Sequence, residues 1–253
     1  MSAATVVWRW GQVEASQNGE DLCLAHRDAQ AQAWVRRGRV VRGPGYDGAS
    51  RAVRHDLART GAIVRLRQRG RYLVHAAGAV DEQGRAWLLA GDSGCGKSTL
   101  AYALARSGWT ILGDDGVLIE VVGDGITAHS WREPLEVSAA LATAFPELGA
   151  HSLRARQEDP RRRIPMTTPL TRAAPVAALV FVKRGERSML TGLGAVASLA
   201  ALVRQSPWVI VEDAHTHDHL DALRFTAGLP SFQLEHTQAD LHTIAQTLSG
   251  SMP

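Results

Sequence analysis

The chain has little cysteine and no long apolar run, and these two shortages argue against a disulfide-rich protein and a membrane-spanning protein. Only Cys23 and Cys95 occur among 253 residues, so there is no disulfide framework, and a reducing compartment fits. No apolar stretch approaches the roughly 20 residues of a membrane span, and residues 1–5 lack the charged start and apolar core of a signal peptide. We therefore expect a cytoplasmic protein with no membrane partner.

Lysine is also scarce, because only Lys97 and Lys183 occur among 28 basic residues. The net charge is only +3, and no basic face interleaved with aromatic residues is evident, so we expect no nucleic-acid partner. Hydrophobic residues make up 45% of the chain. A chain of this length can bury a sizeable core, as one large domain or as one domain with a small appendage.

One segment matches the phosphate-loop pattern G-x-x-x-x-G-K-[ST] in full. An apolar run at 86–90 precedes it and a helix-compatible run at 100–105 follows, which is the strand–loop–helix setting that the motif requires. We expect the backbone N–H groups to cradle the phosphates of ATP, with Lys97 reaching the β- and γ-phosphates and Ser98 facing Mg²⁺. The predicted nucleotide-binding residues are Gly91, Asp92, Ser93, Gly94, Cys95, Gly96, Lys97, Ser98 and Thr99.

Two adjacent carboxylates follow the next predicted strand, at 109–112. Asp114 and Asp115 come 17 residues after Lys97, at the kind of strand end where α/β sheets bind ligands. Because adjacent carboxylates repel each other, leaving both ionised favours a cation beside them. One can hold Mg²⁺ and the other can take the proton of an attacking hydroxyl.

His75 lies in a predicted buried strand at 72–80, one hairpin before the strand that leads into the phosphate loop. A histidine in such a strand is commonly a hydrogen-bonded core residue. Its position near the expected nucleotide makes a functional role an equal alternative.

The flanking regions give less specific patterns. The breaker cluster at 43–48 predicts a boundary between a small N-terminal subdomain, 1–48, and a catalytic domain, 49–253. Residues 49–59 have a helical pattern, and 61–69 alternate apolar and basic residues like a solvated strand.

The arginine-rich stretch 151–175 predicts an exposed loop, either a linker or a lid over an anionic substrate. Its Arg162 and Arg163, with Arg132 before it, are candidate substrate or phosphate contacts. A surface ion pair is the alternative for Arg132. The cluster of His215, His217 and His219 has no accompanying general base or cysteine, so we do not expect a metal site there.

Three motifs in this order resemble the HPr kinase/phosphorylase family and its shorter relatives. They are residues 73–76 around His75, the phosphate loop at 88–98, and 111–115 with the aspartate pair. The resemblance implies an α/β P-loop sheet of the HPr kinase/phosphoenolpyruvate carboxykinase type that phosphorylates a serine hydroxyl. It also implies Asp114 as the catalytic base, Asp115 with Ser98 at the metal, and His75 with Lys97 near the transferred phosphate.

Two departures separate the chain from the HPr enzymes themselves. Thr99 stands where they usually carry glutamate, and residues 131–134 replace their Arg-Gly-Leu-Gly segment. The shorter relatives, including tailoring kinases of precursor peptides such as those of lasso peptides, fit the length and the Lys-Ser-Thr sequence better. The phosphorylase activity is not expected.

The leading hypothesis is therefore a Mg·ATP-dependent kinase whose partner is a peptide or protein substrate with a serine-type hydroxyl. A nucleotide-binding switch without phosphotransfer, an ATPase motor or transporter subunit and a small-molecule kinase are the alternatives, although no Leu-Ser-Gly-Gly signature of an ABC subunit occurs. A homo-oligomer is compatible with the sequence.

Overall fold

The computed structural model describes residues 5–131, 135–137, 139–150, 162–164, 171–211, 213–237 and 239–251. The chain forms two compact units: residues 1–72 with 208–220, called here the first unit, and residues 73–207 with 221–253, called the second unit. The breaker cluster at 43–48 lies within the first unit, and the boundary expected there stays a prediction. No helix in the described part of the chain is both long and apolar enough to cross a membrane.

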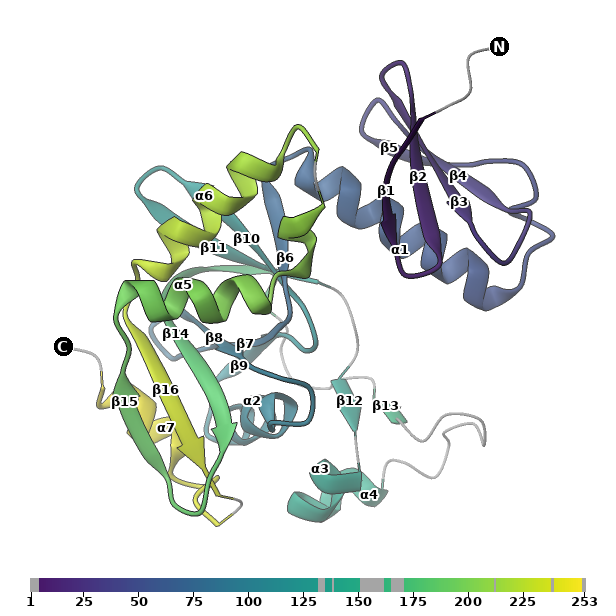
Figure 1. The fold of residues 1–253 in the computed structure, drawn as a ribbon. Coiled ribbons are helices and arrows are strands. Elements are labelled where there is room, and N and C mark those ends of the chain that lie inside the picture. The colour runs from purple at the N-terminus through teal and green to yellow at the C-terminus, as the bar shows by residue number, and fades with distance from the viewer. Residues whose placement is uncertain are drawn as a thin grey trace. The chain divides into compact units, whose positions relative to one another are not determined.

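The first unit contains a five-stranded antiparallel sheet in the order β1-β2-β3-β4-β5. Its strands are β1 (Thr5–Trp10), β2 (Val13–Asn18), β3 (Asp21–His26), β4 (Gln32–Arg36) and β5 (Arg39–Arg42). Alternate residues of β2 and β4 are buried, β3 buries Cys23 as well as Leu22 and Leu24, and helix α1 (Arg51–Arg67) packs against β2 to β5 (Figure 1). The sheet is therefore buried on one face, as the period-2 pattern of its strands requires.

Helix α1 extends further than the sequence pattern indicated. The strand expected over 61–69 is wrong, because the helix continues to Arg67. The buried positions recur at helical spacing: Leu57, Thr60, Gly61, Val64 and Arg67. A Cβ at Gly61 would lie 2.9 Å from a methyl group of Val40, so glycine allows the helix to approach the sheet.

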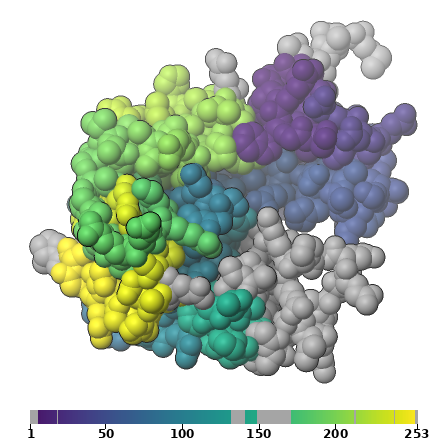
Figure 2. Space-filling model, turned by 60° about the horizontal axis from the view of Figure 1, so that its bottom comes forward, coloured from purple at the N-terminus to yellow at the C-terminus, as the bar shows by residue number. Residues whose placement is uncertain are grey.

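The second unit is built on a mixed nine-stranded sheet. Seven strands follow the order β6-β10-β11-β14-β8-β7-β9, and β16 joins β14 and carries β15. Their bounds are β6 (Arg71–Val74), β7 (Ala76–Val80), β8 (Ala86–Ala90), β9 (Thr110–Gly113), β10 (Val117–Val122), β11 (Gly125–Ser130), β14 (Ala173–Arg184), β15 (Met189–Gly192) and β16 (Ser231–His236). The space-filling view shows β15, in green, against the yellow C-terminal segment (Figure 2).

The chain also contains six α-helices and one 3₁₀ turn besides α1 in its described part. The helices are α2 (Lys97–Arg106), α3 (Ala139–Ala144), α4 (Pro146–Ala150), α5 (Ala195–Arg204), the 3₁₀ turn η2 (Pro207–Ile210), α6 (Thr216–Ala227) and α7 (Ile244–Ser249). The core of the second unit joins α2 to β7, β8, β14, α3, α4 and α7, and it includes the fully buried Trp87, Leu89, Leu100 and Leu104. The sequence prediction of an α/β fold is confirmed at this level.

The expected loop at 151–175 is wrong in part. Residues Arg162–Ile164 form strand β13, which pairs antiparallel with β12 (Leu135–Val137), and β14 already begins at Ala173. Residues 151–161 and 165–170 lie outside the described part of the chain.

Strand directions bring four carboxyl ends to one edge of the sheet. Strands β14 and β16 run parallel to β8, whereas β7 is antiparallel to β8 and β9 is antiparallel to β7. Strand β9 therefore also runs parallel to β8. The segments that follow β8, β9, β14 and β16 consequently lie at the same edge, where open α/β sheets place their ligand sites.

Candidate active site

The glycine-rich segment 91–96 links β8 directly to α2, as the sequence predicted. Two of its glycines are required by their surroundings and not only by a turn. Gly91 has φ 150°, and a Cβ there would lie 2.7 Å from the carbonyl oxygen of Val182. Gly96, the N-cap of α2, has φ 108°, and a Cβ there would lie 2.7 Å from Nε2 of His236. The loop therefore lies closely against the ends of β14 and β16.

Lys97 is almost fully buried beneath this loop. Its ammonium donates hydrogen bonds to the carbonyl oxygens of Gly91 at 2.8 Å and of Asp92 at 3.1 Å, and the residue is 6% exposed. A buried ammonium is stable only where oxygen atoms replace its water. The Lys97 side chain thus lies within the loop whose bound phosphates it was predicted to contact.

Ser98, in the first turn of α2, contacts the first of the two aspartates. Its hydroxyl donates to Oδ1 of Asp114 at 2.8 Å, and Asp114, which follows β9, is only 2% exposed. A serine hydroxyl and a carboxylate are hard oxygen ligands of the kind that Mg²⁺ prefers. The donor set fits the ion, but it pairs Ser98 with Asp114 and not with Asp115.

The second aspartate lies beside His75 instead. Nδ1 of His75 is 3.2 Å from both the Oδ1 atom and the carbonyl oxygen of Asp115, and because both are acceptors, Nδ1 carries the proton. Asp115 has φ 61°, a left-handed conformation that aspartate tolerates better than most residues, and its side chain is 45% exposed. His75 lies at the break between β6 and β7, and the predicted hairpin of β7 and β8 is confirmed.

Gln205 connects the glycine-rich segment 91–96 to the His75 segment. Its side-chain amide donates to Oδ1 of Asp92 at 3.1 Å, while its backbone carbonyl accepts from the backbone N–H of His75 at 2.7 Å. The residue caps α5 and is 5% exposed. Sequence reasoning missed Gln205, since nothing in its local pattern distinguishes it from any polar residue at a helix end.

His236, the last residue of β16, holds the other side of the loop. Its Nε2 lies 3.0 Å from the carbonyl oxygen of Cys95, so Nε2 is the protonated nitrogen, while Nδ1 is buried with no partner among the described residues. Burial raises the pKa of the Cys95 thiol above its ordinary value. Cys95 is therefore a neutral packing residue. His236 was also missed, although a polar residue at a predicted strand end was a usable signal.

The remaining candidate contacts are placed only in part. Arg132 lies outside the described residues. Arg162 and Arg163 lie on β13, where their backbone positions are opposite Val137 and Glu136 of β12. Among the other loop residues, Ser93 is exposed and Thr99 is half-buried. The roles expected for all of these residues stay predictions.

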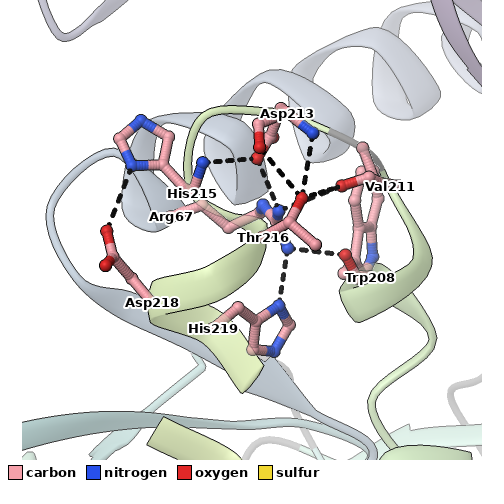
Figure 3. A network of polar contacts seen from close by, with 8 residues as sticks. All are labelled: Arg67, Trp208, Val211, Asp213, His215, Thr216, Asp218 and His219. Atoms are coloured by element: carbon pink, nitrogen blue, oxygen red, sulfur yellow. Dashed lines mark hydrogen bonds and ion pairs between the residues drawn. The ribbon is translucent and has the colours of Figure 1, made fainter. Parts of the chain in front are cut away.

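The histidine-rich segment at 213–219 forms a polar network within the first unit (Figure 3). The buried Arg67 donates to Nδ1 of His219 at 2.6 Å, to Oδ1 of Asp213 at 2.9 Å and to the carbonyl oxygens of Trp208 and Val211. His215 instead lies 4.0 Å from a carboxylate oxygen of Asp218. His219 thus serves as an acceptor for a guanidinium, a role that the sequence did not suggest.

This environment determines the charge of His219. Burial first, and then the neighbouring Arg67, lower the pKa of the imidazole from 6.5 to about 3. Because an arginine nitrogen can only donate, Nδ1 of His219 is unprotonated. The ring also stacks on Tyr72 with centroids 4.5 Å apart. His219 is therefore neutral at physiological pH.

Comparisons with known proteins find similarity only at the level of solved structures. No model of a protein family matches the chain, and no curated protein matches it. Among solved structures, the HPr(Ser) kinase/phosphatase from Coxiella burnetii is similar over 70% of this chain and 93% of its own, with 13% sequence identity and a TM-score of 0.36. A likeness at this level assigns no activity to the chain.

Proposed function

We propose that the second unit is a Mg·ATP-dependent kinase that transfers a phosphoryl group to a hydroxyl of a peptide or protein. The observation that carries the proposal is the contact of Ser98 with Asp114 beside a loop that contains a buried lysine. A strand–loop–helix with these residues presents backbone N–H groups and a helix N-terminus to phosphate oxygens. A serine-bearing peptide, such as a ribosomal precursor peptide, is the acceptor that the sequence resemblance supports.

The geometry favours exchanging the roles that the resemblance implied for the two aspartates, the metal ligand and the catalytic base. Asp114 is buried on Ser98, so these two side chains would hold Mg²⁺. When bound, the ion would offset negative charge on the phosphate oxygens. Asp115 is exposed and lies beside His75, so it is the better-placed base.

The transfer then follows from positions of the chain's own groups. The acceptor oxygen attacks the γ-phosphorus and its proton moves to the Asp115 carboxylate, while ADP leaves with the electrons of the broken bond. His75 donates a hydrogen bond from Nδ1 to the Asp115 carboxylate and so orients it. Lys97 would turn from the loop carbonyls toward the phosphates that the loop surrounds.

Two asparagine variants separate the assigned roles. Asp114→Asn should lose Mg²⁺-dependent binding of a fluorescent ATP analogue, whereas Asp115→Asn should bind it normally and lose about 10²-fold or more in transfer rate. Transfer is measured by mass spectrometry on a library of serine-containing synthetic peptides. Asp124→Asn, in the exposed turn between β10 and β11, is the matched control.

Three outcomes would contradict the proposal at different levels. Normal transfer by Asp115→Asn would show that Asp115 is not the base. Failure of the unmodified protein to bind the ATP analogue would remove the nucleotide site altogether. Tight ATP binding without any phosphorylated acceptor would instead favour the nucleotide-dependent switch.

A further inference from the structure

Strand β5 is an outer strand of the sheet in the first unit, and all four of its residues are exposed. It pairs with β4 and with no other strand in the described part of the chain. A two-residue hairpin at Arg37 and Gly38, with φ values of 46° and 67°, joins the two strands. The opposite edge of β5 therefore presents backbone groups that no described strand uses.

The alternation of hydrogen-bonded and non-bonded pairs in the hairpin shows which residues of β5 carry these free backbone groups. Gly43 donates its N–H to the carbonyl of Gln32 at 2.9 Å, and Gln32 donates its own N–H to the carbonyl of Pro44 at 2.9 Å, so Gln32 is a bonded position that faces residues 43 and 44 across a bulge. Because bonded and non-bonded pairs alternate in an antiparallel ladder, the pairs 34/41 and 36/39 are bonded as well. The N–H and C=O groups of Val40 and Arg42 consequently point away from β4.

The two edges of this sheet are protected differently. In β1 the register shifts between Val6 and Trp8, an irregularity of the kind that disrupts edge pairing. Strand β5 keeps a regular register with β4 and carries an arginine at each end, Arg39 and Arg42. Like charges oppose the pairing of β5 with a second copy of itself, but they attract an acidic strand.

Charge around β5 is unbalanced. The first unit, residues 1–72 with 208–220, contains 13 of the chain's 28 basic residues and nine of its 25 acidic ones, a formal charge of +4 against +3 for the whole chain. Arg42 is paired with Asp47 at 2.9 Å, whereas Arg37 and Arg39 have no ion-pair partner among the described residues. The basic residues are thus more concentrated here than the overall composition suggested.

The open face beside β5 combines this charge with apolar surface. Val41 lies opposite Trp34 in the register, on the same face as Arg39, and is 42% exposed. On β4, the guanidinium of Arg36 lies 4.3 Å from the centroid of the Trp34 ring. The other face of the sheet packs on α1 (Figure 1).

We propose that the outer edge of β5 binds an extended acidic peptide segment as an added strand. The peptide backbone would pair with Val40 and Arg42, an acidic side chain would lie beside Arg39, and a β-branched or aromatic one beside Val41. Outward N–H and C=O groups together complement a peptide backbone, whereas the phosphates of a nucleic acid only accept hydrogen bonds. This interaction goes beyond the proposed phosphotransfer and needs no nucleotide.

The test uses the full chain and a fluorescein-labelled ten-residue peptide that alternates glutamate and valine. Fluorescence anisotropy without ATP should show saturable binding, which Arg39→Glu weakens roughly tenfold. The matched control is Arg9→Glu on β1, the opposite edge of the same sheet, and it should change the affinity less than about twofold. Amide hydrogen exchange should slow on binding at Val40 and Arg42 but not at Val41, which is already bonded to β4.

The controls identify what would overturn the proposal. Equal binding of a peptide of the same charge interrupted by three prolines would show attraction by charge without strand addition. Protection of β1 amides instead of β5 amides would show that the peptide binds the opposite edge of the sheet. Preferential binding of a thymidine oligonucleotide would show that the partner is a nucleic acid and not a peptide. Protection of Val40 in the peptide-free protein that disappears on dilution would mean that a second copy occupies the edge.

Discussion

Acidification should destabilise the first unit through His219. This side chain is fully buried, and its Nδ1 accepts a hydrogen bond from Arg67, so protonation forces a second cation against a buried guanidinium. The pKa is lowered from 6.5 to about 3, with burial as the larger cause. Asp213, which also contacts Arg67, opposes this effect, and the stacked ring of Tyr72 adds no charge at these pH values.

The sign follows from the order of the two pKa values. The unfolded chain binds a proton on His219 near pH 6.5 and the folded chain only near pH 3, so stability is complete above pH 6.5 and falls as the pH decreases toward 3. With about 1.4 kcal/mol per pH unit, His219 should cost roughly 3 kcal/mol of unfolding free energy between pH 7.5 and 4. That is a large share of the 5–15 kcal/mol typical of a domain.

Urea unfolding of the unmodified chain and of His219→Gln at pH 7.5 and pH 4 measures this loss. Glutamine keeps an acceptor for Arg67 but does not titrate, so the variant should be less stable at pH 7.5 and should lose about 3 kcal/mol less on acidification. His217→Gln, exposed and two residues away, is the control and should follow the unmodified chain. An equal pH dependence in the His219 variant, or an NMR titration of His219 near pH 6.5, would refute the reasoning.

Three further substitutions test the loop and the turn that precedes it. Gln205→Leu should lower kcat/KM for ATP about tenfold, by removing a buried hydrogen bond of roughly 1–1.5 kcal/mol to the loop, and steady-state kinetics would check this. Gly96→Ala should abolish binding of the fluorescent ATP analogue, whereas Gly123→Ala, with φ 60° but nothing within 4 Å of its Cβ, should bind normally. Asp81→Asn should lower the Tm, because the buried carboxylate accepts hydrogen bonds from Arg85 and from Nε1 of Trp87; an unchanged Tm would contradict this role.

The strand, loop and helix around Gly91–Lys97 could be predicted because their signals are local. An apolar run, three glycines and a helical pattern occur within 20 residues, and the structure follows them closely. The position of Asp114 and Asp115 at the end of β9 could likewise be predicted from a short apolar run. In each case, the conformation of a residue depends mainly on its neighbours in sequence.

The error over 61–69 has a physical cause. Arginines at 65, 67 and 69 alternate with apolar residues, which imitates a strand with one solvated face. In the structure Arg67 is instead buried, because Asp213, His219 and two carbonyl oxygens surround its guanidinium. A pattern that counts every arginine as exposed cannot detect a buried one whose partners lie over 140 residues away.

Gln205 and His236 could not be found for a related reason. Each contacts the glycine-rich segment 91–96 from a distant part of the chain, 113 residues from Asp92 in one case and 141 from Cys95 in the other. Such contacts exist only after β14 and β16 have aligned parallel to β8. Their detection requires the sheet topology, which short sequence patterns do not specify.

The two aspartates show how backbone conformation separates groups that sequence makes equivalent. Adjacent carboxylates suggested a shared cation, since their repulsion requires compensation. In the structure, Asp115 has a left-handed φ, and the two carboxylates have different surroundings. Asp114 is buried against the Ser98 hydroxyl, and Asp115 is exposed beside His75. Each carboxylate has its own hydrogen-bond donor, so one cation need not neutralise both. Under the proposed function, Asp114 would hold Mg²⁺ while Asp115 exchanges a proton, which is the separation that phosphoryl transfer to a hydroxyl needs.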